Sequence, residues 1–200
     1  MIRLNLWLGR FRWLAHPLAL IPLAWLIWRW STDGLTANPI QFITHKTGKT
    51  ALNLLVLSLA ISPLRRATRL TALAPLRKWL GLWGFFYASL HFSIYIGLDY
   101  FFDWQLIWLE LSGKRYVLVG FTAWLLLIPL ASTSTKGWQR RLAKRWKRLH
   151  LLAYAITPLV VIHFTWLVKS DYREPALYGI IVALLFLLRI KIFAARFYTS

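Results

Sequence analysis

The sequence predicts an all-α, polytopic membrane protein that folds as a six-helix bundle with both termini in the cytoplasm. Hydrophobic residues make up 58% of the 200 positions, and the mean hydropathy is +0.53. A soluble domain of this length does not reach such a composition. Six apolar runs are close to the length of one bilayer crossing, and basic residues separate them in an alternating pattern.

The six runs define the expected helices. They span roughly residues 13–30, 48–64, 79–98, 116–131, 149–168 and 175–195. The second and fourth are near the lower length limit for a membrane span. No long polar segment divides the chain, so we expect a single transmembrane domain over residues 1–200.

The charges indicate the orientation in the membrane. Of the 25 Lys and Arg residues, 18 lie in the N-terminal segment, the loops 65–78 and 136–148, and the C-terminal end, whereas all six acidic residues lie in the alternate loops. By the positive-inside rule the basic side is cytoplasmic. The net charge of +19 therefore indicates topology, and we expect the lipid bilayer as a partner and no nucleic acid.

The loop between the fourth and fifth spans predicts a short amphipathic helix at the membrane surface. Ser134 or Thr135 is the expected N-cap. The binding of anionic lipid headgroups is favoured over docking of a soluble electron donor, and both remain open. The apolar residues at helical spacing among its Lys and Arg residues are Trp138, Leu142, Trp146 and Leu149.

Histidine is the only plausible protein ligand for a transition metal inside this membrane domain. The sequence has no cysteine, and its one methionine is Met1, which excludes disulfides, iron–sulfur clusters and c-type haem. The span directions place His91 and His163 at one depth in the outer half of the bilayer. His16 and His150 lie near the inner edge.

The fifth span carries two of these histidines. His150 and His163 are 13 residues apart, or about 20 Å along a helix, which indicates two stacked metal centres. On an ideal helix they point about 140° apart, so we expect Pro158 to kink or rewind the helix and turn both inwards. His45, at the outer surface, is either a quinone or proton site or a solvated histidine.

Small residues accompany His91 on one helix face. Ala88 and Gly84 lie one and two turns before it and leave room for a flat ligand such as a porphyrin. The alternative is close packing of a neighbouring helix against this stripe. The shared depth of His91 and His163 favours a flat ligand over close helix packing.

Several motifs together resemble the MsrQ (YedZ) family of the ferric-reductase-like transmembrane superfamily, over nearly the whole chain. They are HKTGKTAL at 45–52, ISPLRR at 61–66, LGLWGFFYASLH at 80–91, STST at 132–135 followed by QRRLAKRWKRLH at 139–150, and IHFTW at 162–166.

The resemblance implies a bacterial inner-membrane protein with one or two b-type haems. His91 and His163 match the principal axial ligands of the haem iron, and His150 matches a third ligand. FMN is also implied. Electrons would come from the quinone pool or a cytoplasmic flavin reductase and pass to a periplasmic, molybdopterin-containing MsrP-like reductase that reduces methionine sulfoxide.

The inner site departs from the pattern of relatives with two histidines on each of two helices. Arg77 and Lys78 stand where a partner for His150 is expected. His16 is the geometric candidate for that second ligand, and the alternative role for Arg77 is to pair a haem propionate or another anion.

The function expected is therefore that of a non-catalytic electron-transfer subunit, with no catalytic residues of its own. Two alternatives remain: a stand-alone ferric or quinone reductase on the same haem scaffold, and a non-redox membrane transporter. A membrane hydrolase is poorly supported because there is no H-E-x-x-H motif and every carboxylate lies in an outer loop.

Overall fold

The computed structural model describes residues 11–32 and 34–197, and these residues form helices without any strand, which confirms the all-α prediction. The long helices are α2 (Ala15–Ser31), α3 (Pro39–Thr68), α4 (Ala74–Ile94), α6 (Arg115–Ser132), α9 (Ala153–Leu167) and α10 (Arg173–Phe197). The shorter ones are η1 (Phe11–Leu14), η2 (Thr71–Leu73), the π-helical turn η3 (Tyr95–Asp99), α5 (Trp104–Gly113), α7 (Lys136–Leu142), α8 (Lys144–Leu149) and η4 (His150–Leu152).

Each predicted span overlaps one long helix. Among the described residues, three segments are long and apolar enough to cross a membrane: Pro39–Thr68, Arg115–Ser132 and Lys144–Leu167, the last of which joins α8, η4 and α9. A crossing by all six helices, and the side on which the termini lie, stay predictions. Arg3, Arg10 and Asp33, which contribute to the charge pattern, lie outside the described residues.

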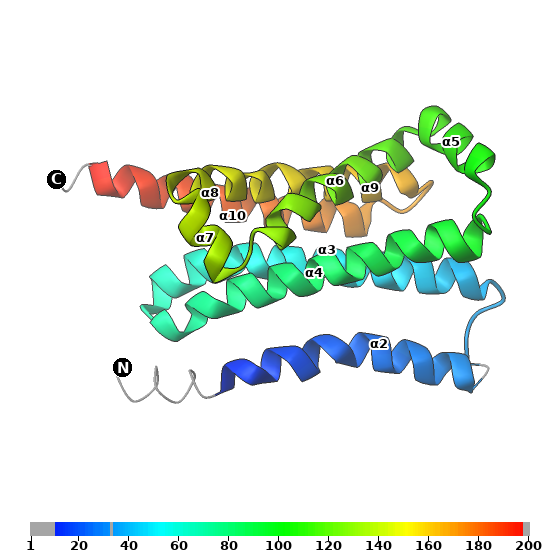
Figure 1. Cartoon of the computed structure of the whole chain (residues 1–200), viewed down its shortest axis with the longest axis horizontal. Helices are drawn as coiled ribbons and strands as arrows, with labels where there is room; N and C mark the ends of the chain where they lie inside the picture. Colours follow the sequence, from blue (N-terminus) through cyan, green and yellow to red (C-terminus); the bar gives the residue numbers. More distant parts are fainter. Residues whose placement is uncertain (1–10, 33, 198–200) are drawn as a thin grey trace.

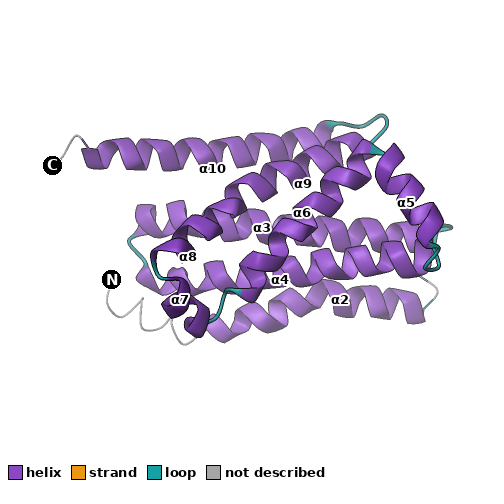
Figure 2. Ribbon diagram, turned by 45° about the horizontal axis from the view of Figure 1, so that its top comes forward, coloured by secondary structure: helices purple, strands orange, loops and turns teal. Residues whose placement is uncertain are grey.

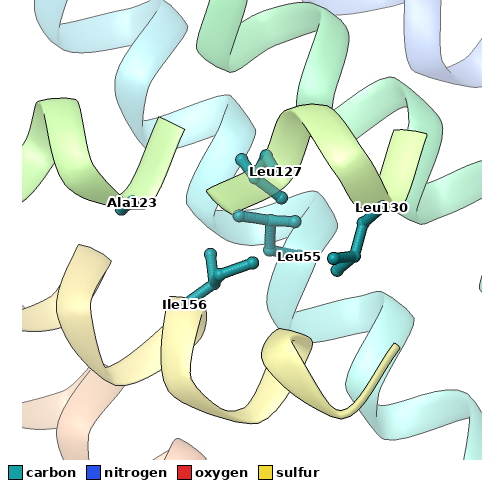
Figure 3. Close-up of a cluster of buried hydrophobic side chains, with 5 residues drawn as sticks. All are labelled: Leu55, Ala123, Leu127, Leu130 and Ile156. Carbon is teal, nitrogen blue, oxygen red and sulfur yellow. The ribbon is translucent and has the colours of Figure 1, made fainter. Parts of the chain in front are cut away.

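The long helices run roughly parallel to one axis (Figure 1). α3 and α4 form an antiparallel pair that separates α2 from α6, α9 and α10, and η1 and the end of α10 lie at the same end of the bundle as α7 and α8 (Figures 1 and 2). We call this the α7 end, and the opposite one the α5 end. The two halves of the bundle meet at a buried cluster (Figure 3): Leu55 of α3, Ala123, Leu127 and Leu130 of α6, and Ile156 of α9.

The loop between α6 and α8 differs in part from its prediction. The Thr135 hydroxyl accepts a hydrogen bond from the backbone N–H of Trp138 (3.3 Å), which confirms Thr135 as the N-cap of α7. Instead of one helix there are two, because the chain turns sharply at Ala143, where φ is 45°. The Trp146 indole N–H donates to the Thr133 carbonyl at the end of α6 (2.9 Å). This bond holds α8 back against α6, which a continuous helix would not allow.

A buried tyrosine joins α2 to α4. Tyr87 is fully buried, and its hydroxyl donates to the Ala19 carbonyl (2.6 Å) and accepts from the Leu23 N–H (3.2 Å). In an uninterrupted helix that N–H would bond the carbonyl four residues earlier, which is that of Ala19. The hydroxyl is thus inserted into the backbone ladder of α2, beside Pro22.

We expect Tyr87→Phe to destabilise the folded protein by about 1–3 kcal/mol, because two buried backbone groups lose their partner. Chemical unfolding of the detergent-solubilised protein measures this difference. Tyr172→Phe, at a 51% exposed position, is the control and leaves stability unchanged. Equal stability of the Tyr87→Phe protein would show that α2 restores its own hydrogen bond.

Candidate functional site

A cavity of about 770 Å³ lies among α3, α4, α5, α6 and α9, towards the α5 end of the bundle. Most of its lining is apolar or aromatic. His91 and His163 both line it, and so does Ala88. A cavity of this size accommodates a ligand as large as an organic cofactor.

His91 is held by α3. Its Nδ1 lies 2.8 Å from the Thr44 carbonyl oxygen, and its ring packs against Gly48, where a Cβ would lie 3.1 Å from two ring atoms. A carbonyl oxygen only accepts hydrogen bonds, so Nδ1 carries the proton of the neutral imidazole. The lone pair is then on Nε2, which is the arrangement found in metal-binding histidines.

His163 is held by α6 in the same way. Its Nδ1 lies 2.7 Å from the Tyr116 carbonyl oxygen, and its ring packs against Gly120. A Cβ at Gly120 would lie 2.5 Å from Nδ1, closer than any real contact. Only glycine therefore allows the ring its present position, and Nε2 again carries the lone pair.

The separation of the two histidine rings suits one metal ion between them. Their centroids are 6.3 Å apart and their planes are inclined by 81°. With metal–nitrogen bonds of about 2.0–2.1 Å, two imidazole centroids on opposite sides of one metal lie about 6 Å apart. Within the described residues no group of three or more His, Cys, Asp or Glu side chains could bind a metal. Two histidines in an apolar cavity therefore fit a metal whose remaining ligands come from a macrocycle.

Helix α5 covers the cavity at one end. Trp104, Ile107, Trp108 and Leu111 line it from this helix. The Asp103 side chain caps the start of α5 by accepting from the Leu106 N–H (3.0 Å). Near its end Lys114 donates to Glu110 (2.5 Å), a hydrogen bond that raises the pKa of Lys114. These contacts fix the short helix between α4 and α6.

The small residues before His91 have different environments. Ala88 lines the cavity, as expected. Gly84 packs against Leu55 of α3 instead, because a Cβ there would lie 3.0 Å from the leucine side chain. Close helix packing, the alternative raised for this stripe, therefore explains Gly84.

The predicted inner residues do not join this site. His16 accepts at Nδ1 from the Trp83 indole N–H (3.2 Å) and contacts Trp79 edge-on. His150 stacks on Trp146 with ring centroids 3.9 Å apart, and no described hydrogen bond or ring contact joins it to His16. The helix is rewound at η4, around His150 itself, rather than at Pro158. His45 is exposed at the edge of the cavity.

An internal repeat explains why His91 and His163 have equivalent surroundings. It was not among the patterns predicted from the sequence. The pattern G-x-T-A-x-x-L-L occurs at 48–55 and again at 120–127. The same shift of 72 positions relates Thr44 to Tyr116 and His91 to His163, so each carbonyl lies 47 residues before its histidine. Gly48 and Gly120 are the functional residues that this repeat would have revealed.

Comparison with known proteins agrees with the site. Residues 47–161 match the family model described as ferric reductase like transmembrane component. Over 178 residues the chain is 49% identical to the protein-methionine-sulfoxide reductase heme-binding subunit MsrQ of Xanthomonas axonopodis pv. citri, covering 86% of this chain and 82% of that protein. The chain belongs to the MsrQ family.

Two further MsrQ proteins show the same relation. That of Xanthomonas campestris pv. campestris is 51% identical over 176 residues (85% of this chain, 81% of that protein). That of Caulobacter vibrioides is 42% identical over 179 residues (89% and 84%). No solved structure matches the chain.

We expect Gly120→Ala to destabilise the protein by about 1–3 kcal/mol, because the added methyl group displaces the His163 ring from the Tyr116 carbonyl. Unfolding in detergent measures the loss. Gly179→Ala in α10 is the matched control, since its Cβ would lie 3.9 Å from Val161, an ordinary contact. A Gly120→Ala protein as stable as this control would contradict the tight packing of His163.

Proposed function

We propose that this chain is the haem-binding membrane subunit of a protein-methionine-sulfoxide reductase and carries electrons towards a periplasmic partner. The observation that carries the proposal is the His91–His163 pair, with both Nδ1 atoms engaged and the rings 6.3 Å apart in an apolar cavity. Membership of the MsrQ family, whose relatives are heme-binding subunits, supports it.

His91 and His163 would hold the iron of a b-type haem through their Nε2 atoms. The haem supplies one-electron Fe(III)/Fe(II) chemistry. The protein holds each imidazole in one tautomer and one orientation through the carbonyls of Thr44 and Tyr116. The mostly apolar lining of the cavity would keep water away from the bound haem, which favours electron transfer.

The direction of transfer follows from the ends of the bundle. The cavity lies towards the α5 end, which the charge pattern predicts to be the non-cytoplasmic side, and the family resemblance predicts a bacterial inner membrane. The proposed acceptor there is a molybdopterin-containing MsrP-like reductase. The donor is quinol or a cytoplasmic flavin reductase acting at the basic α7 end, and FMN is proposed from the family resemblance alone.

A second haem is the less supported part of the proposal. It would use His150, with His16 as the candidate second ligand and Arg77 beside a propionate. The internal repeat argues against a symmetric inner pair, because the position equivalent to His150 is Lys78. Co-purification with the periplasmic reductase, and electron delivery to it, would separate this subunit from a stand-alone ferric or quinone reductase.

We expect the purified wild-type protein to show a haem Soret band and a dithionite-reduced b-type spectrum. His91→Ala and His163→Ala should each abolish the haem at this site, because one imidazole cannot replace two. His45→Ala, an exposed histidine at the cavity edge, is the control and keeps the wild-type spectrum. Full haem content and unchanged spectra in both cavity variants would refute the ligand pair.

A further inference from the structure

Two arginines meet on one face of α3 at the α7 end of the bundle. Arg77 of α4 donates to the Ser62 hydroxyl (3.2 Å), and Arg189 of α10 donates to the Leu59 carbonyl (3.2 Å). Leu59 and Ser62 are three residues apart, so they lie on the same side of α3. The two guanidinium groups are close enough to interact electrostatically, and both are partly buried.

The surroundings add more positive charge. Arg65 lies close enough to Arg77, and Arg66 to Arg189, to interact with them. The described salt bridges, Lys49–Glu174 and Lys114–Glu110, join residues near the other end, and no described Asp or Glu lies at this one. Holding like charges together in a partly dry site is costly unless an anion compensates them.

Hydrogen-bonding capacity is also left over. A guanidinium has five N–H donors, and the described hydrogen bonds use one from each arginine. His150 interacts electrostatically with Arg77, and its Nε2 is buried without a hydrogen-bond partner among the described residues. The Arg189 guanidinium lies over the ring of Tyr154, with Cζ 4.5 Å from the ring centroid. The two arginines are therefore held in place, and several of their N–H donors remain outside the described hydrogen bonds.

We propose that Arg77 and Arg189 bind a phosphate group, carried either by an anionic lipid headgroup or by soluble phosphate. The planar fork of arginine suits bidentate binding of phosphate oxygens. Arg189 lies 16 residues into α10, about 24 Å along the helix, which places it near the headgroup level at the basic side. Basic pockets between membrane helices at that level bind lipid phosphates.

The test uses the full-length protein with its bound cofactor, purified in neutral detergent. Native mass spectrometry measures binding of cardiolipin and of phosphatidylcholine, and thermal unfolding measures binding of inorganic phosphate. We expect Arg77→Gln and Arg189→Gln to lower the affinity for the phosphate ligand roughly tenfold or more. Arg69→Gln, at an exposed arginine that follows α3 at the same end of the bundle and lies outside α7 and α8, is the matched control and keeps the wild-type affinity.

The source of the phosphate follows from the wild-type result. Preference for cardiolipin without a response to inorganic phosphate identifies a lipid headgroup, and a response to inorganic phosphate identifies a soluble source. Both interpretations require that the Arg77 and Arg189 variants bind the phosphate group more weakly than the wild-type protein does. If Arg189→Gln does not fold, Arg189→Lys replaces it in the test. This variant keeps the positive charge but loses the planar guanidinium, so it should still bind the phosphate group more weakly.

Three results would overturn the proposal. The first is wild-type protein that binds cardiolipin no more strongly than phosphatidylcholine and is not stabilised by inorganic phosphate. The second is an equal loss of affinity in Arg69→Gln, which would make the effect one of surface charge. The third is a lower haem content in the Arg77 and Arg189 variants with unchanged phosphate binding, which would assign the arginines to a porphyrin carboxylate.

Discussion

The site depends on one interaction made twice, the hydrogen bond from a histidine Nδ1 to a carbonyl oxygen of the neighbouring helix. His91 bonds Thr44 across the α3–α4 pair, and His163 bonds Tyr116 across the α6–α9 pair. Each bond uses a carbonyl in the first turns of its helix. It fixes the tautomer and the ring orientation together, so both lone pairs are prepared for a metal before any metal binds.

The repeat shows which parts of this arrangement are shared and which are not. Around the cavity, small and large residues recur at a shift of 72 positions: Ala51 with Ala123, and Leu55 with Leu127, all four buried. The two helical pairs therefore pack against each other through equivalent surfaces. At the α7 end the equivalence is lost, because His150 corresponds to Lys78, which is exposed. The two ends of the bundle therefore carry different side chains at equivalent positions.

Much of the fold was predictable because apolar length and charge act over whole helices. The depth argument also paired His91 with His163, since both lie a similar distance along spans of the same direction. Local geometry was less accessible. Nothing in the spacing of Trp138 and Trp146 indicated the turn at Ala143, which depends on a hydrogen bond to Thr133. Gly84 resembled a ligand-facing residue, yet Leu55 fills the space beside it.

The two ends also differ in how they meet the cost of burying polar groups in a membrane. At the cavity, two neutral imidazoles satisfy one nitrogen each through the backbone, so no charge is buried and no counterion is required. At the α7 end, 14 residues or about 21 Å before His91 on the same helix, Arg77 carries a charge that cannot be removed at any ordinary pH. Backbone and hydroxyl acceptors satisfy single N–H groups there but do not compensate the charge. A bound anion would balance the charge at this end of the bundle, whereas the neutral imidazole pair at the other end suits a metal ion.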